Sequence, residues 1–265
     1  SRVLINVLGI PLLLSAIYFG GIYFQCLIFI AIFMSTLELK SMCLKKDIEI
    51  QMFPMYLFYV YLFLTHFIEP LNMEVLLLII ILILLLEIFR KKTKPIENIA
   101  VTIFGIVWIG IFMNCIVIIR NNQFGVDYTL LMFLCVWICD SAAFIFGSKF
   151  GKAKILPNIS PNKTWIGTLA GLVSVFILLS IFVYLSIPSF RYNNFLHAIA
   201  FSLIFGGIGQ IGDFVESMIK RQFGVKDSGT SLRGHGGFLD RMDSLMLAAP
   251  AFYLYLRYAV GPYFG

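Results

Sequence analysis

Long apolar runs, separated by short polar or glycine- and proline-containing breaks, make up most of this chain. A helix needs about 20 consecutive apolar residues to cross the hydrocarbon core of a bilayer. Because 60% of the 265 residues are hydrophobic and only 13% are charged, a soluble domain is excluded. We expect an all-α polytopic membrane protein, with residues 1–265 forming one membrane domain. The runs predict about nine transmembrane helices, over residues 3–19, 22–38, 52–68, 73–89, 99–119, 128–147, 165–187, 195–219 and 242–264.

Basic residues are unevenly divided between the two sides of these spans. When successive loops are assigned to alternate sides, 17 of the 20 Lys and Arg residues fall on one side, and only Arg120, Arg191 and Arg257 fall on the other. Basic loops are retained in the cytoplasm during insertion, so this bias predicts a cytoplasmic N-terminus and an extracytoplasmic C-terminus. It also explains the net charge of +6 without a nucleic-acid partner. The adjacent Gly20 and Gly21 predict a tight helical hairpin between the first two spans.

Acidic residues are distributed differently in the two halves of the chain. After residue 140 they move into the spans: Asp140 and Asp213 lie about 10 Å from the cytoplasmic ends of their helices, and Asp240 and Asp243 open the last span. We expect these four carboxylates to meet in one layer, and charged groups inside a membrane mark functional sites. The earlier acids lie at span ends or in loops, and we interpret them as solvated: Glu38, Asp47, Glu49, Glu69, Glu74, Glu87, Glu97 and Asp127.

The spacing of the inner acids favours a cation site. Asp213 and Glu216 lie three residues apart and share a helix face, as do Asp240 and Asp243, and Lys220 extends the first of these stripes. Carboxylates that are brought together repel one another unless positive charge lies between them. A hard divalent cation such as Mg²⁺ would supply that charge. The alternative is a network of salt bridges to neighbouring Lys and Arg side chains that holds the helices together.

Two polar loops on the same side have compositions that suit phosphate groups. In residues 220–237, glycines allow backbone N–H groups to approach an anion, and Lys and Arg side chains add charge. Their spacing matches neither a P-loop nor a dinucleotide-binding fingerprint. The second loop ends at the start of a helix, where Ser160, Lys163 and Thr164 are placed to meet an anion. An ordinary helix N-cap explains Thr164 equally well.

A long motif runs through the second half of the chain, with SMIKR at 217–221, GVKDSG at 224–229 and GHGGFLDRMDS at 234–244. Shorter segments accompany it at 140–141, 150–152, 159–161 and 163–165. Together they resemble the signature of the phosphatidate cytidylyltransferases, the CDP-diacylglycerol synthases. The resemblance is tight over residues 137–250, the expected catalytic half, whereas residues 1–130 match only as hydrophobic spans. In two places the chain departs from the family pattern, with Ile166 in place of an acid and Arg233 in place of a proline.

The resemblance implies transfer of CMP from CTP to phosphatidic acid, with release of pyrophosphate and a requirement for Mg²⁺, alone or with a second cation. It implies that Asp213, Asp240 and Asp243 are catalytic residues that bind the metal, and that Lys226 is a fourth catalytic residue. For His235, a contact to phosphate or loop backbone and a purely structural role are equally compatible with the sequence. The substrate-binding residues implied are Asp140, Ser160, Lys163, Thr164, Ser217, Lys220, Arg221, Asp227, His235 and Arg241.

Two other functions stay open on the sequence alone. A CTP-dependent polyprenol or phytol kinase shares part of this C-terminal architecture. An ion-coupled transporter also carries acids inside its spans, but here they gather at one surface rather than at the midplane, and no inverted repeat is seen. For the synthase, the expected partners are CTP, phosphatidic acid and the bilayer, and the expected location is the bacterial inner membrane with the site facing the cytoplasm. The long apolar surface suits lipid, and it suits a homodimer equally well.

Overall fold

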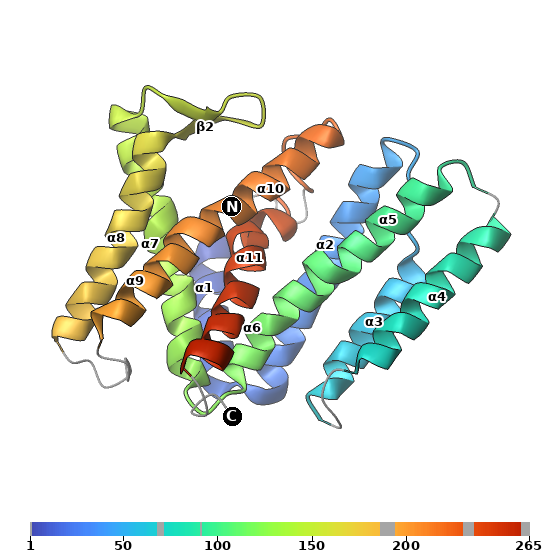
Figure 1. The fold of residues 1–265 in the computed structure, drawn as a ribbon, viewed down its shortest axis with the longest axis horizontal. Helices are drawn as coiled ribbons and strands as arrows, with labels where there is room; N and C mark the ends of the chain where they lie inside the picture. The colour runs from blue at the N-terminus through green and yellow to red at the C-terminus, as the bar shows by residue number, and fades with distance from the viewer. Residues whose placement is uncertain (1, 68–71, 91, 186–193, 230–235, 261–265) are drawn as a thin grey trace.

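The computed structural model describes residues 2–67, 72–90, 92–185, 194–229 and 236–260, with side chains from residue 8 onward. These residues form a bundle of helices with one small β-hairpin (Figure 1). The first half contains α1 (Arg2–Phe19), α2 (Gly21–Leu44), α3 (Met52–Thr65), α4 (Met73–Arg90) and a continuous helix made of α5 (Pro95–Gly105), the π-helical η1 (Ile106–Ile111) and α6 (Phe112–Arg120). The second half contains α7 (Gly125–Phe150), β1 (Lys154–Leu156), β2 (Ser160–Thr164), α8 (Trp165–Tyr184), a second continuous helix made of α9 (Phe195–Leu203), the π-helical η2 (Ile204–Ile208) and α10 (Gly209–Gln222), and finally α11 (Leu239–Tyr255) with η3 (Leu256–Val260).

The helices coincide with the predicted spans, and the helical fold class is confirmed. Five helices within the described residues are long and apolar enough to cross a membrane: Gly21–Leu44, Pro95–Arg120, Gly125–Phe150, Trp165–Tyr184 and Phe195–Gln222. Leu8–Phe19 and Met52–Thr65 are apolar but shorter. The count of nine spans and the sides of the two termini therefore stay predictions.

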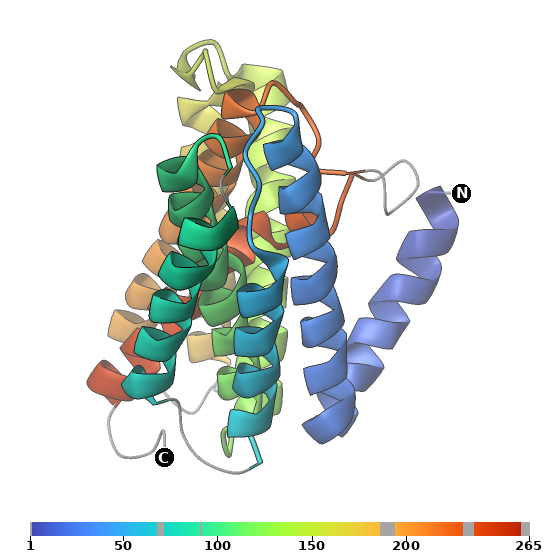
Figure 2. The ribbon, with the colours of Figure 1, turned by 90° about the vertical axis from the view of Figure 1, so that its right-hand side faces the viewer.

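Successive loops lie at alternate ends of the bundle, as expected when each helix crosses it once. One end, which we call the basic end, is formed by the loops after α2, α4 and α7 together with the C-terminus of α10 (Figure 1). Lys45, Lys46, Lys92 and Lys94 lie in the first two of these loops. The turn between α1 and α2 and the C-terminal end of α11 lie at the opposite end (Figures 1 and 2). One end of the bundle therefore collects the positive charge that predicted the topology.

The turn between α1 and α2 is the tight hairpin that the two glycines predict. Gly20 has a φ of 63° and Gly21 a φ of 50°, a left-handed conformation that other residues rarely adopt. Arg120, at the end of α6, donates hydrogen bonds from Nε to the carbonyl of Ile17 (2.5 Å) and from Nη2 to the carbonyl of Tyr18 (3.1 Å). The last carbonyls of a helix lack intrahelical donors, so this guanidinium caps α1. In Figure 2, α1 then diverges from α2 with distance from the turn.

The interpretation of the early acids as solvated is wrong for Glu87. Its side chain on α4 is buried. Oε1 accepts a hydrogen bond from Asn98 Nδ2 (2.7 Å), and Oε2 accepts hydrogen bonds from Gln51 Nε2 (2.7 Å) and Arg90 Nη1 (3.0 Å). Gln51 directly precedes α3, Arg90 ends α4 and Asn98 lies on α5, so the carboxylate joins the start of α3 to α4 and α5 at the basic end. A buried carboxylate persists when its oxygens are paired in this way.

A β-hairpin, which the sequence reading did not predict, follows α7. Strands β1 and β2 pair antiparallel, with Lys154 opposite Thr164 and Leu156 opposite Ser160. Thr164 is buried, and its Oγ1 accepts a hydrogen bond from the backbone N–H of Gly167 (3.2 Å). The N-cap explanation of Thr164 is therefore confirmed. Lys163 is the penultimate residue of β2, and its side chain reaches Asp213 on α10.

An aromatic cluster joins the long helix Phe195–Gln222 to α11. The ring of Phe252 lies edge-on to Phe201 (centroids 5.0 Å apart) and to Phe205 (4.9 Å), and all three side chains are fully buried. Edge-to-face aromatic pairs add about 0.5–1.5 kcal/mol each to the burial of their surface. This contact holds together the two helices that carry Asp213, Asp240 and Asp243.

Candidate active site

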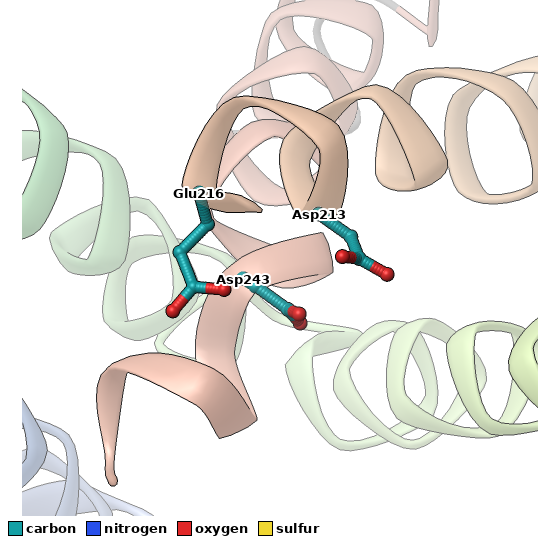
Figure 3. A group of neighbouring side chains, drawn as sticks. All are labelled: Asp213, Glu216 and Asp243. Carbon is teal, nitrogen blue, oxygen red and sulfur yellow. The ribbon is translucent and has the colours of Figure 1, made fainter. Parts of the chain in front are cut away.

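Three carboxylates from two crossing helices meet beside the basic end. α10 provides Asp213 and Glu216, and α11 provides Asp243 (Figure 3). One oxygen from each side chain lies within 4.8 Å of the others. Glu216 is fully buried, and the two aspartates are partly buried. We call these three residues the acidic cluster.

The close crossing of α10 and α11 depends on the residue before Asp213. A Cβ atom on Gly212 would lie 2.5 Å from the backbone oxygen of Asp243 and 3.4 Å from Cα of Ser244. Only a hydrogen atom fits at the first distance, so glycine lets the two backbones approach each other. The approach brings the helix face with Asp213 and Glu216 against the first turns of α11.

Two lysines neutralise part of the negative charge. Lys163 from β2 forms an ion pair with Oδ2 of Asp213. Nζ of Lys220 lies 2.6 Å from Oε2 of Glu216 and 2.6 Å from Oδ1 of Asp240. The salt bridges that the sequence offered as an alternative to a metal are thus present.

These lysines do not satisfy every oxygen of the acidic cluster. Oε1 of Glu216 is buried and has no hydrogen-bond partner among the described residues. A carboxylate oxygen left in this state is costly unless a cation reaches it. Hard oxygen donors in excess of the neighbouring positive charge are the ligands that Mg²⁺ and similar ions prefer. Asp213, Glu216 and Asp243 therefore fit a divalent cation.

Two further predicted residues lie next to the acidic cluster. Asp140 is exposed on α7 and interacts electrostatically with Asp213 and with Lys163. Ser217, one turn after Asp213 on α10, donates a hydrogen bond from Oγ to Oδ1 of Asp213 (3.3 Å). Together with Lys163, these two residues add polar groups from α7, α10 and β2 around Asp213.

Asp240 lies outside the acidic cluster, and its expected role as a metal ligand stays a prediction. Its Oδ1 is taken by Lys220, and its Oδ2 accepts hydrogen bonds from the backbone N–H groups of Ser228 (3.0 Å) and Gly237 (2.8 Å). It thus anchors the loop that precedes α11. Glu216 takes the third place in the cluster. Its position three residues after Asp213 was the signal in the sequence that indicated it.

Glu38 is a polar residue of this region that the sequence reading missed. Its interpretation as a solvated acid at a span end is wrong, because the residue is only 4% exposed. Its carboxylate contacts Ser228 and the start of α11. No local signal distinguishes Glu38 from the other early acids, since its partners lie about 190 to 201 residues away in sequence.

The predicted phosphate-binding residues of the 220–237 loop have different contacts. Arg221 donates from Nε to the carbonyl of Ile159 (3.1 Å) and from Nη1 to the carbonyl of Val225 (2.9 Å), so it joins the loop to the β-hairpin. Lys226 and Asp227 are exposed and line a cavity of about 670 Å³ between α2 and the loop.

The remaining predicted residues are placed as follows. Arg241 is exposed in the first turn of α11, and Ser160, at the start of β2, is partly buried. Ile166, one of the two departures from the family pattern, is exposed in the first turn of α8. His235 and Arg233 lie outside the described residues.

The fold and the site together define a helical membrane protein with an acidic, lysine-flanked site near one end of its bundle. The chain belongs to the cytidylyltransferase family, whose model matches residues 1–259. The match includes the first 130 residues, in which the motifs provided no resemblance beyond hydrophobic spans.

Named relatives cover different shares of the chain. The chain is 31% identical over 256 residues to a phosphatidate cytidylyltransferase of Staphylococcus saprophyticus, across 94% of this chain and 95% of the relative. It is 34% identical over 189 residues to the phosphatidate cytidylyltransferase of Bacillus subtilis, across 70% of this chain and 68% of the relative. It is 46% identical over 126 residues to that of Staphylococcus aureus, across 48% of this chain and 47% of the relative.

Proposed function

We propose that this protein transfers CMP from CTP to phosphatidic acid, giving CDP-diacylglycerol and pyrophosphate, and that a divalent cation assists the reaction. Membership of the cytidylyltransferase family and relatives named phosphatidate cytidylyltransferase support the activity. The observation that carries the mechanism is the acidic cluster, in which three carboxylates from two helices lie within 4.8 Å and are flanked by lysines.

The reaction joins two anions, so charge neutralisation is the main task of the site. A phosphate monoester has a second pKa near 6 and is mostly dianionic at pH 7. The lipid phosphate therefore attacks the α-phosphorus of CTP without a general base. A bond forms between a lipid phosphate oxygen and the α-phosphorus, and the bond from the α-phosphorus to the oxygen bridging the β-phosphorus breaks, so that pyrophosphate leaves with the electron pair.

Residues of this chain have distinct parts in that neutralisation. Asp213, Glu216 and Asp243 would hold the divalent cation, which when bound supplies positive charge at the phosphate oxygens. Lys163 and Lys220 are positioned to contact the phosphates, because their ammonium groups already lie among the ligand oxygens. Asp240 forms the second ion pair of Lys220 and so helps to keep it in place.

Removal of divalent cations is expected to lower the activity of the purified protein to below about 1% of its starting rate, since the acidic cluster has no other source of divalent charge. The measurement is incorporation of labelled CTP into lipid, with EDTA and then with excess Mg²⁺. Full activity in EDTA would show that Lys163 and Lys220 alone neutralise the reacting phosphates.

Labelled CTP separates the synthase from the kinase alternative. With CMP transfer, label at the α-phosphorus enters the lipid product and label at the γ-phosphorus is released in pyrophosphate. With a polyprenol or phytol kinase, label at the γ-phosphorus enters the lipid and CDP is left in solution. We expect the first pattern with phosphatidic acid as acceptor. Transfer of γ-label to a lipid alcohol, without transfer of α-label, would replace our proposal with the kinase.

We also propose that the protein has nine spans and lies in the bacterial inner membrane with the site facing the cytoplasm. The gathering of basic loops at the end near the acidic cluster supports this orientation, because such loops are retained in the cytoplasm. The exposed apolar residues of α1 and α4 fit lipid, and they fit a second copy of the chain equally well.

A further inference from the structure

We propose that Glu38 is a positioning residue of the reaction, through which α2 fixes the start of α11 and thereby places Asp243 in the acidic cluster. The proposal rests on the proposed function for its catalytic consequence, and on contacts in the structure for its physical basis. It assigns a role to the first half of the chain, which contributes no residue to the acidic cluster itself.

The carboxylate of Glu38 caps α11 from another helix. Its Oε1 accepts a hydrogen bond from the backbone N–H of Phe238 (3.0 Å), and its Oε2 accepts from that of Leu239 (3.0 Å). The first N–H groups of a helix have no intrahelical acceptor. Phe238 occupies the N-cap position of α11 and offers no side-chain acceptor. Glu38 therefore satisfies donors that the local sequence leaves open, and its negative charge faces the positive end of the helix dipole.

At two positions of the loop, the carboxylate of Glu38 lies so close to the backbone that only glycine fits. A Cβ atom on Gly229 would lie 2.9 Å from Oε1 of Glu38, and one on Gly237 would overlap Oε2 of Glu38 and Oγ of Ser228. The sequence reading explained the loop glycines by close approach of a phosphate. At these two positions, the close neighbour in the structure is the carboxylate of Glu38.

A chain of polar contacts connects Glu38 to the acidic cluster. The Ser228 hydroxyl lies 3.0 Å from Oε2 of Glu38 and 2.8 Å from Oδ2 of Asp240, and donates its single proton to one of them. Asp240 in turn contacts Lys220, and Lys220 contacts Glu216. Asp240 also precedes Asp243 by one helical turn. Displacement of the first turn of α11 would therefore move a cluster ligand directly and disturb a second through Lys220.

A charged carboxylate is needed in this position, because the backbone N–H groups of Phe238 and Leu239 and the hydroxyl of Ser228 can all donate to it. A glutamine at position 38 keeps one acceptor oxygen but turns an NH₂ group toward the N–H groups or the hydroxyl. At least one donor would then lose its acceptor inside a buried region, and the charge facing the helix dipole would be lost. Glu38→Gln preserves side-chain volume, so its effect reports on these interactions rather than on packing.

Glu87 offers a matched control. It is also buried at the basic end and its carboxylate also accepts hydrogen bonds from neighbouring elements, but its partners lie on α4, on the residue preceding α3, and on α5. Glu87→Gln should therefore lower the melting temperature in detergent while leaving turnover and metal binding per folded molecule unchanged.

The experiment measures Mn²⁺ binding by electron paramagnetic resonance and CMP transfer as a function of Mg²⁺, on monodisperse full-length protein. We expect Glu38→Gln to weaken Mn²⁺ affinity about tenfold and to lower kcat about tenfold. Ser228→Ala should change both quantities in the same direction, but to a smaller extent. Ser228→Ala serves where Glu38→Gln yields no folded protein. Wild-type Mn²⁺ affinity and kcat in the folded variants, or equal losses in Glu87→Gln, would overturn the proposal. If the wild type makes no CDP-diacylglycerol, the proposed function fails, while the Mn²⁺ comparison still tests the role of Glu38.

Discussion

Replacing Asp243 with asparagine is expected to lower the rate of CMP transfer by about a thousandfold, because the change removes a metal-binding carboxylate at the point where phosphate charge must be neutralised. Asparagine has nearly the same shape, and Oδ1 of Asp243 already accepts a hydrogen bond from the backbone N–H of Ser244 (2.6 Å), a contact that an amide oxygen retains. The helix crossing should therefore survive. The measurement is transfer of α-labelled CTP into lipid by purified protein over a range of Mg²⁺ concentrations.

Asp127→Asn is the control for this substitution. Asp127 lies in the first turn of α7, at the end of the bundle opposite to the acidic cluster, and its substitution should change the rate by less than about twofold. An Asp243→Asn protein that keeps wild-type turnover and Mg²⁺ dependence would remove Asp243 from the metal site.

The same assay discriminates the two sets of ligands that the sequence and the structure favour. Glu216→Gln should raise the Mg²⁺ concentration needed for half-maximal rate, because Glu216 belongs to the acidic cluster. Asp240→Asn should act mainly by releasing Lys220 and the loop at Ser228 and Gly237. The reverse pattern, in which Asp240→Asn raises the Mg²⁺ requirement and Glu216→Gln does not, would favour Asp213, Asp240 and Asp243 as the ligands.

Gly212→Ala is expected to reduce CMP transfer by about a hundredfold or more, with a loss of about 1–3 kcal/mol in stability from overpacking. The new methyl group would meet the backbone oxygen of Asp243 at 2.5 Å, so α10 and α11 must separate. That separation moves Asp213 and Glu216 away from Asp243. Turnover, Mn²⁺ affinity and melting temperature are measured on the same preparation.

Gly207→Ala provides the comparison for this prediction. Gly207 lies in η2 of the same continuous helix. Apart from its chain neighbours and the nearby backbone of its own helix, no atom of the described residues lies within 4 Å of the position that its Cβ would occupy. It should leave turnover and Mn²⁺ affinity near wild type. If Gly212→Ala also leaves the Mn²⁺ affinity unchanged, the cluster does not depend on the close approach of α10 and α11.

Local sequence patterns predicted the features that depend on neighbouring residues. Apolar runs marked the helices, since a span is defined by its own hydrophobicity. The spacing of Asp213 and Glu216 placed both on one helix face, and Gly20 with Gly21 marked the hairpin. These features need no knowledge of how distant parts of the chain pack.

Features that depend on distant partners were not predictable in this way. Glu38 and Glu87 have the same local setting as a solvated acid at a span end, and only their partners on other elements show that they are buried. Asp240 shares a helix face with Asp243, yet hydrogen bonds from a loop direct its carboxylate elsewhere. The short strands of the β-hairpin, which include a proline at position 161, also have no alternating apolar pattern that would mark them.

The ion pairs of Lys163 and Lys220 have a thermodynamic consequence for ligand binding. A cation that takes Asp213 and Glu216 as ligands competes with these ammonium groups for the same oxygens. A phosphate that attracts the ammonium groups reduces that competition. By linkage, each ligand must raise the affinity for the other by the same factor. Without ligands, the lysines neutralise part of the charge of the carboxylates. Metal and nucleotide are therefore expected to bind with positive cooperativity rather than independently.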